Sequence, residues 1–322
     1  MEYELPLHVK HLKAMSKYNA RNVARGNAMK IIVLDTETTG MFEKDRICQL
    51  SFLVLNEEFE IEEVHDALCK PPLPISYEAM AIHHITPEKV EGEPTCVQTK
   101  AYKRLLELNS PANILIIQNA TFDLGMLAKE GFSSQMSLID TFRVLRAYYP
   151  LEGSFSLQYK RYQWGLYREE EALEQKLGIR INAHDALGDV IVLKYLFERL
   201  CDEHSIPKMI LLCSEPIVLS HIPYGKNKGK KFIDVAKSDR QDLHYMLNSN
   251  GLDEDMKASI LHALESTKDD ITLTIGFGKY AGKTPLEVLE IDRNYLVWMV
   301  NKMDNLSNEL KEAIEKVLVS YP

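Results

Sequence analysis

The chain has 322 residues, of which 45% are hydrophobic and 26% are charged, values that are ordinary for a globular protein. This length allows one large domain or two of average size, each with its own buried core. A net charge of −9 argues against a protein that coats nucleic acid without specificity, although an acidic metal site is compatible with it. No stretch approaches the ~20 apolar residues of a membrane span, so no membrane partner is expected.

Five cysteines are scattered along the chain and never occur in CxxC or Cys/His spacing. This pattern favours reduced thiols, and therefore a cytoplasmic protein, over a disulfide framework. Residues 1–28 are polar and basic and lack the apolar core of a secretory signal. Two interpretations stay open: these residues form a frayed or helical N-terminal arm, or Met29 is the biological start.

Acidic residues follow the first apolar run. Residues 31–34 predict a short buried strand, and Asp35 and Glu37 come after it, two residues apart. Because side chains alternate along a strand, both carboxylates project from the same side. Oxygen ligands at this spacing suit Mg²⁺ or Mn²⁺. Acids that simply face solvent are the ordinary alternative, so the metal hypothesis needs partners elsewhere in the chain.

A hairpin and two helices are predicted next. Residues 47–55 and 59–68 indicate two antiparallel strands around a polar turn. A proline-rich stretch at residues 70–74 then interrupts regular structure. Ser76 is the predicted N-cap of a short helix, and residues 97–108 have helical periodicity.

A further acid lies at the start of a predicted helix. Residues 114–117 form a short apolar run, typical of a strand buried on both faces. The turn that follows has Thr121 as its predicted N-cap and Asp123 in the first helical turn, where the helix macrodipole favours a charged acid. Residues 137–139 predict a brief strand, which leads into a helix that ends before Pro150.

The last candidate group opens a long helix over residues 190–201. His184 and Asp189 would lie about 140° apart if both were helical, so they converge only if His184 precedes the helix. Asp185 and Asp189 share a helix face at i and i+4, which leaves Asp185 as an alternative ligand. Gly188 costs ~1 kcal/mol relative to alanine inside a helix, which indicates the close approach of another group.

The order of the elements predicts an α/β domain. Strands and helices alternate up to residue 205, where the domain is expected to end. Residues 156–178, just before the last candidate group, are helical in propensity. An irregular linker is predicted at residues 206–217, because the segment contains prolines.

Four acids and one histidine thus stand at the ends of predicted elements: Asp35, Glu37, Asp123, His184 and Asp189. Their motifs are Asp-Thr-Glu-Thr-Thr-Gly at residues 35–40, Asn-Ala-Thr-Phe-Asp at 119–123 and His-x4-Asp at 184–189. In this order they resemble the DEDDh exonucleases of the DnaQ-like, ribonuclease H-like superfamily. Residues 74–86 and 277–283 are most similar to the exonuclease X family.

The resemblance implies a ribonuclease H-like mixed β-sheet flanked by helices over residues 29–205. It implies a 3′→5′ exonuclease that hydrolyses the 3′-terminal phosphodiester of DNA, in DNA repair. Two Mg²⁺ or Mn²⁺ ions would be held by the four acids: Asp35, Glu37, Asp123 and Asp189. His184 would accept the proton of the attacking water. Four residues are placed near the terminal nucleotide: Thr38, Thr39, His83 and Asn119. About twenty residues, between Leu157 and Leu177, depart from the family pattern.

The C-terminal part contains an apparent duplication. Residues 222–230 and 275–283 align at an offset of 53, and the similarity continues into the segments that follow. The expected units are residues 218–267 and 271–322, although the family carries one such unit. Three residues, not the four of a P-loop, separate Gly278 from Gly282, which argues against an ATPase.

Four lysines recur in the two glycine-containing loops: Lys226, Lys230, Lys279 and Lys283. They predict contacts with nucleic-acid backbone, with DNA preferred over RNA as partner. The alternative is that the glycines only serve left-handed turns and the aromatic residues fill a small core.

Other functions are weighed against DNA exonuclease activity. The same site would serve an RNA 3′-trimming exonuclease or the proofreading subunit of a polymerase. A binding protein without catalysis would need a defective ligand, and all five motif positions are intact.

Overall fold

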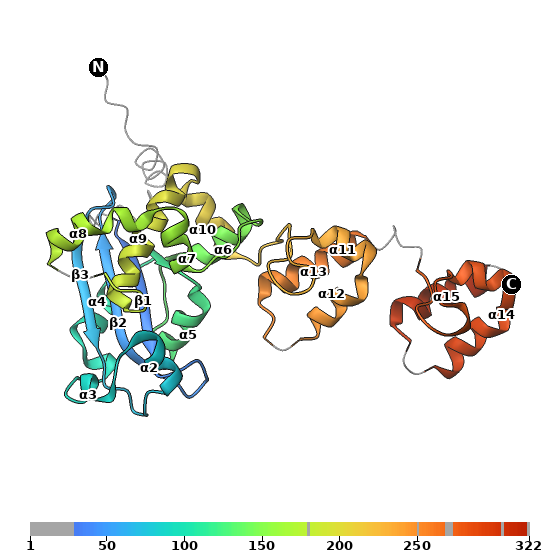
Figure 1. Cartoon of the computed structure of the whole chain (residues 1–322), viewed down its shortest axis with the longest axis horizontal. Helices are drawn as coiled ribbons and strands as arrows, with labels where there is room; N and C mark the ends of the chain where they lie inside the picture. The colour runs from blue at the N-terminus through green and yellow to red at the C-terminus, as the bar shows by residue number, and fades with distance from the viewer. Residues whose placement is uncertain (1–28, 179–180, 250, 268–272, 304–305, 321–322) are drawn as a thin grey trace, which may run out of the picture. The chain divides into compact units, whose positions relative to one another are not determined.

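The computed structural model describes residues 29–178, 181–249, 251–267, 273–303 and 306–320. Within these residues, five strands form one mixed sheet in the order β3-β2-β1-β4-β5 (Figure 1). The strands are β1 (Ile31–Thr38), β2 (Ile47–Leu55), β3 (Ile61–Leu68), β4 (Ile114–Ile117) and β5 (Ser137–Asp140). β2 pairs antiparallel with β1 and β3, whereas β4 pairs parallel with β1 and β5.

Helices cover both faces of the sheet. They are α2 (Tyr77–His83), α3 (Pro87–Val90), η2 (Cys96–Gln98), α4 (Lys100–Leu108), α5 (Ala120–Lys129), α6 (Thr141–Tyr148), α7 (Leu157–Gln163), η3 (Leu166–Arg168), α8 (Glu170–Leu177), α9 (Ala186–Glu203) and α10 (Ile206–Ser214). Alternation along β1 separates two cores: Ile31 and Val33 belong to the cluster that includes α9, and Ile32 and Leu34 to the one that includes α4 and α5. The predicted mixed sheet flanked by helices is confirmed.

Pairing along β1 leaves its carboxyl end open. β4 pairs with β1 only at Ile31, Ile32 and Val33, whereas β2 accompanies β1 along its whole length. The two acids of β1 therefore lie beyond the end of the β4 pairing. The candidate site forms at this end of the central strand, beyond its pairing with β4.

Three predicted elements differ in the structure. Asn119, not Thr121, is the N-cap of α5, because the distant Asp140 carboxylate accepts hydrogen bonds from the first backbone N–H groups of this turn. The helical segment 156–178 is divided into α7, η3 and α8, with Gly165 at φ 70° between the first two. The irregular structure predicted for residues 206–217 is wrong for most of that range, because α10 forms there with its proline in the first turn, where proline is tolerated.

The helices beyond residue 217 are α11 (Phe232–Ser238), α12 (Arg240–Leu247), α13 (Glu254–Ser266), η4 (Gly278–Tyr280), α14 (Pro285–Lys302) and α15 (Asn308–Ser320). The chain divides into two compact units: one runs to Lys231 and includes Gly251–Ser259, and the other comprises Phe232–Asn250 and Ile260–Pro322. This division falls within the first predicted repeat, so the predicted domain boundaries stay a proposal.

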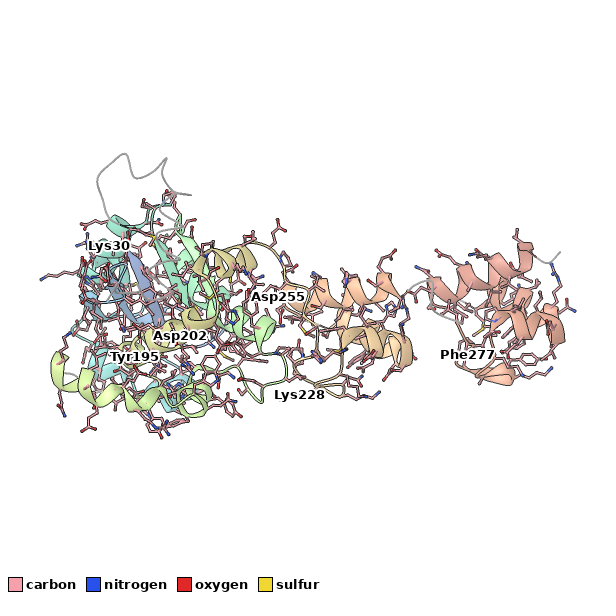
Figure 2. All side chains as sticks on the ribbon, turned by 90° about the horizontal axis from the view of Figure 1, so that it is seen from above. Lys30, Tyr195, Asp202, Lys228, Asp255 and Phe277 are labelled. Carbon is pink, nitrogen blue, oxygen red and sulfur yellow. The ribbon has the colours of Figure 1, made fainter. Side chains whose placement is uncertain are left out.

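An ion pair inside the first unit ties residues 251–259 to α6. The guanidinium of Arg143 donates to both carboxylate oxygens of Asp255, at 2.9 and 2.8 Å, and also to the carbonyl of Cys213 (Figure 2). The side chain of Asp255 is 5% exposed. Its Oδ1 also accepts from the backbone N–H of Ile217, so the carboxylate is fully engaged.

The two glycine-lysine loops share one pattern of backbone hydrogen bonds. In the first, Ile222 N–H donates to the Lys230 carbonyl, and Gly229 N–H donates back to the Ile222 carbonyl. Ile275, Lys283 and Gly282 do the same in the second. Each loop also has two glycines at positive φ: Gly225, Gly229, Gly278 and Gly282. None of the helices in the described part of the chain has the length and apolar character needed to span a membrane.

Candidate active site

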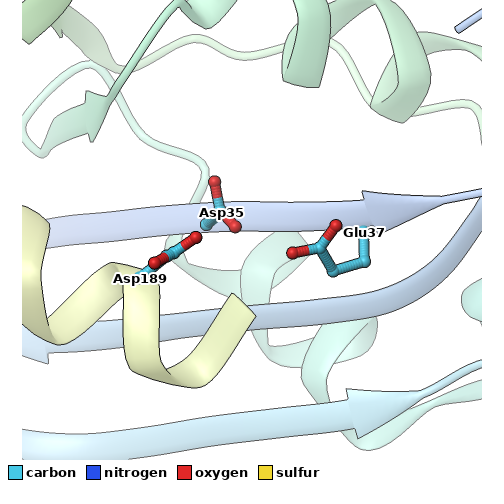
Figure 3. Close-up of side chains that lie close together, drawn as sticks. All are labelled: Asp35, Glu37 and Asp189. Carbon is cyan, nitrogen blue, oxygen red and sulfur yellow. The ribbon is translucent and has the colours of Figure 1, made fainter. Parts of the chain in front are cut away.

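Three carboxylates from two elements converge beyond the end of the β4 pairing. Asp35 and Glu37 project from the same side of β1 towards Asp189, which lies in the first turn of α9 (Figure 3). One oxygen of each carboxylate lies within 4.8 Å of the other two. Hard oxygen donors at this separation fit a divalent cation. The predicted position of both β1 acids on one face is thereby confirmed.

Asp123 approaches the same end of β1 from α5. Its Oδ1 accepts hydrogen bonds from the Thr36 hydroxyl at 2.7 Å and from the Thr36 N–H at 3.1 Å. Asp123 is 3% exposed and lies in the first turn of its helix, as predicted. The sequence analysis does not predict this role of Thr36. Strand alternation is the available signal, because it points the Thr36 side chain to the opposite face of β1 from Asp35 and Glu37.

The pKa values of the four acids reflect their burial and their mutual repulsion. Burial, followed by the charges of Asp123, Asp189 and Glu37, raises the pKa of Asp35 well above its ordinary value. Burial and neighbouring acids raise the pKa of Glu37 to about 8. Burial also raises the pKa of Asp123 and of Asp189 to about 7 each, although hydrogen bonds oppose both shifts. Positive charge at this site would therefore stabilise the ionised carboxylates.

The loop before α9 shows which of two aspartates, Asp185 or Asp189, joins the acidic cluster. Asp185 is the N-cap residue of α9, and its Oδ1 accepts a hydrogen bond from the Gln49 side chain at 2.8 Å. Asp189, not Asp185, joins the acidic cluster. His184 precedes the helix at φ 57° and is exposed, which meets the geometric condition for its convergence with Asp189.

Gly188 explains how this loop packs so closely. A Cβ atom added there would lie 2.1 Å from the backbone carbonyl oxygen of Asn182. No side chain fits in this space, so the close approach that the helix glycine predicts is confirmed. The backbone of the His184 loop therefore rests directly on the first turn of α9.

Gln158 supports Asp189 from α7. Its amide nitrogen donates to Asp189 Oδ1 at 2.5 Å, and its Oε1 accepts from Arg161 at 3.2 Å. Arg161 in turn forms a buried ion pair with Glu170 of α8. The segment between residues 157 and 177, which departs from the family pattern, therefore contacts a candidate metal ligand. No local sequence pattern predicts this contact between Gln158 and Asp189.

The residues predicted beside the terminal nucleotide are partly engaged with protein groups. His83 is 6% exposed; its Nδ1 accepts from Ile85 N–H at 2.9 Å, so Nε2 carries the proton and donates to the Thr38 carbonyl at 3.1 Å. Burial lowers the pKa of His83, so it is neutral near pH 7. The Thr39 hydroxyl donates to Asp45 at 2.8 Å. These contacts position the loop after β1, and direct nucleotide contact stays a prediction.

Asn119 is more accessible. It is exposed at the start of α5 and lines a cavity of about 590 Å³. Among the four loop lysines, Lys230 donates to the Asn227 side chain at 2.8 Å, and Lys279 lies 3.4 Å from an Asp292 carboxylate oxygen. Their contact with nucleic acid stays a prediction.

The fold and the acidic cluster together indicate an enzyme that acts on phosphoryl groups with the help of a metal ion. Half-buried and buried carboxylates at the end of a central strand, with an exposed histidine on the adjoining loop, are groups that a metal-assisted hydrolysis of phosphodiesters uses. The sheet order and the acidic cluster do not by themselves distinguish a nuclease from another phosphotransfer enzyme. Comparison with known proteins makes that distinction.

A family model described as exonuclease matches residues 32–197, slightly more than half of the 322 residues. A second model, described as exodeoxyribonuclease X-like C-terminal, matches residues 275–304. The chain therefore belongs to the exonuclease family. It is a hydrolase with an exonuclease domain, and the predicted similarity to exonuclease X is confirmed.

Individual relatives extend this comparison. The chain is 23% identical over 238 residues to exodeoxyribonuclease 10 of Escherichia coli strain K12, which covers 73% of this chain and 99% of the relative. It is 31% identical over 141 residues to DNA polymerase III subunit epsilon of Buchnera aphidicola, which covers 38% of this chain and 58% of that relative. A solved structure of exonuclease X in complex with 5′ overhanging duplex DNA is 21% identical, covers 57% of this chain and 98% of that one, and has a TM-score of 0.40.

Proposed function

We propose that this chain is a 3′→5′ exonuclease that removes nucleotides from DNA in a repair process. The convergence of Asp35, Glu37 and Asp189 within 4.8 Å, with Asp123 held nearby, is the observation that carries the proposal. The relative that the chain covers almost completely is named as an exodeoxyribonuclease, which supports DNA as substrate.

The four carboxylates hold two Mg²⁺ or Mn²⁺ ions in this proposal. Such ions supply Lewis-acid stabilisation of the charge that develops on the phosphate. Thr36 keeps Asp123 oriented through two hydrogen bonds, and Gln158 does the same for Asp189. The unfavourable charge density of the apo cluster favours cation binding.

His184 accepts the proton of the attacking water. It is exposed and lies on the loop that packs against the first turn of α9, so it is next to the acids without being buried among them. Asn119, Thr38 and Thr39 orient the terminal nucleotide, and His83 holds the Thr38 carbonyl in place. Orientation of this kind lowers the entropic part of the barrier.

Proofreading is a second candidate, because the chain resembles a polymerase III epsilon subunit over 141 residues. A separate role in repair is favoured by the exodeoxyribonuclease X-like C-terminal match at residues 275–304. All five cysteines are free and buried, which supports a cytoplasmic location with reduced thiols.

Digestion of matched substrates tests the proposal. Single-stranded DNA, duplex DNA and RNA of one sequence, each labelled at the 5′ end, are incubated with the full chain and Mg²⁺. Shortening of DNA that Asp35→Ala abolishes is expected. Asp202→Ala, near the C-terminal end of α9 where the carboxylate is 61% exposed, is the control and should stay active. RNA shortened much faster than DNA would replace the DNA proposal, and no shortening of any substrate would overturn the nuclease proposal.

A further inference from the structure

Helix α7 carries exposed tyrosines beside the acidic cluster. Gln158 of this helix reaches Asp189 at 2.5 Å. Tyr162 lies four residues further on, so it occupies the same side of α7 one turn away. The side chain of Tyr162 is 63% exposed and that of Tyr159 is 43% exposed. The exposed parts of both rings are open to a ligand, and the Tyr162 ring also contacts the Tyr167 ring and the Arg161 guanidinium.

A lysine-rich loop adjoins Tyr159 through Gly153. The Nζ atom of Lys228 donates to the Gly153 carbonyl at 3.0 Å (Figure 2). On the other side, a Cβ atom added to Gly153 would lie 2.8 Å from the Tyr159 hydroxyl oxygen. Lys228 belongs to residues 224–231, which contain four exposed lysines and no acid. Aromatic and cationic groups thus lie side by side within one compact unit.

The second glycine-lysine loop, at residues 277–284, has fewer lysines than the first. The position equivalent to Lys228 is Ala281, and residues 277–284 contain two lysines. Lys279 is paired with Asp292 and lies over the Tyr280 ring, 4.8 Å from its centroid. Both loops have the same backbone hydrogen bonds, so the turn itself does not require the extra lysines of the first.

We propose that Tyr159, Tyr162 and the loop at residues 224–231 bind the single-stranded DNA segment that precedes the 3′ end in the acidic cluster. Tyrosine rings stack on successive bases, and lysines neutralise the phosphates between them. The chain has a net charge of −9, so a local group of lysines is needed to attract a polyanion. This inference rests on the proposed exonuclease function and assigns the strand a path along α7.

Steady-state cleavage of a long and a minimal substrate tests this path. The long substrate is a 25-nucleotide oligothymidylate, and the minimal one is thymidine 5′-(4-nitrophenyl phosphate), which cannot reach the tyrosines. Because loss of one base–aromatic stack costs about 5- to 150-fold in affinity, Tyr159→Ala and Tyr162→Ala should each raise KM for the long substrate by that factor. Neither should change cleavage of the minimal substrate, and Tyr162→Phe should retain wild-type KM. Tyr245→Ala, which removes a tyrosine 77% exposed on α12, is the control.

Salt dependence tests the lysine loop separately. Lys228→Glu should flatten the dependence of log KM on log salt by about 0.7 for each phosphate contact that is lost. Lys103→Glu, on α4, is the matched control. The binding of oligothymidylates of increasing length to Asp35→Ala protein provides a second readout: affinity should grow with length, and adding Tyr159→Ala and Tyr162→Ala should remove that growth.

Two results would overturn the inference: unchanged KM for the long substrate in both alanine variants, or an equal rise in KM for the two substrates. If the wild-type chain cleaves neither substrate with Mg²⁺, the proposed exonuclease function fails instead. The two failures are therefore distinguishable.

Discussion

Burial of the Asp189 carboxylate beside other acids predicts that Asp189→Asn stabilises the metal-free protein while abolishing its activity. Asparagine keeps the Oδ1 acceptor for Gln158 but removes one negative charge from a site that already holds three others. The variant should therefore fold at least as well as the wild type in the absence of metal. Loss of nuclease activity accompanies this gain, because a candidate metal ligand is lost.

The sign and size of the effect follow from the pKa of Asp189. Burial raises this pKa from 3.8 to about 7, so the folded state binds a proton more tightly than the unfolded state. Stability of the wild type must then fall as pH rises from about 4 to about 7. Each pKa unit corresponds to about 1.4 kcal/mol, so the ionised form costs up to about 4 kcal/mol above pH 8. About 2 to 3 kcal/mol of this cost develops between pH 5 and pH 8.5.

Thermal unfolding in EDTA at pH 5 and pH 8.5 measures this difference. Asp189→Asn should raise Tm relative to wild type, and the gain should be about 5 to 10 °C larger at pH 8.5. The control is Asp202→Asn on the same helix, whose side chain is 61% exposed and 3.4 Å from Arg199. That substitution should change stability by no more than about 0.5 kcal/mol. If the variant is no more stable than wild type at pH 8.5, or if the gain in Tm does not depend on pH, the pKa of Asp189 is not raised in the folded protein.

Two further substitutions test packing around the site. Gly188→Ala places a Cβ atom 2.1 Å from the Asn182 carbonyl oxygen, so the loop before α9 must move and kcat should fall about 100-fold. Gly125→Ala is the control, because its Cβ atom meets open space, and it should leave kcat unchanged. Wild-type kcat in the first variant would contradict this. Arg143→Met removes the bidentate cation of the buried Asp255 carboxylate and leaves it only Arg146, 3.9 Å away, so the variant should lose about 3 kcal/mol of stability in chemical denaturation. Adding Asp255→Leu should restore part of that loss, and no loss in the single variant would refute the role of the pair.

The central part of the fold was predictable because local patterns coincide with long-range packing. The apolar run at residues 31–34 is buried on both faces of the sheet, so its sequence alone predicts a strand, without knowledge of the strands beside it. The same holds for residues 114–117. Asp35 and Glu37 could be placed together because strand alternation is a local rule.

Other features depend on partners far away in sequence. The start of α5 is set by the Asp140 carboxylate, which caps this turn from 20 residues downstream. Gln158 meets Asp189 only because α7 packs against α9, and no spacing in the sequence encodes that crossing. The sequence predicts irregular structure at residues 206–214 because proline usually interrupts a helix, whereas the first helical turn accepts it.

The most direct measurement of the central claim follows both ends of one single-stranded oligonucleotide during digestion. One fluorophore is attached near the 5′ end and a different one to the 3′-terminal nucleotide. A 3′→5′ exonuclease should release the 3′ label at once and shorten the 5′-labelled strand stepwise. Both signals should require Mg²⁺, stop on addition of EDTA and be absent in Asp35→Ala. Release of the 5′ label first, or cleavage that continues without metal or without Asp35, would contradict the assignment of the acidic cluster as a 3′→5′ exonuclease site.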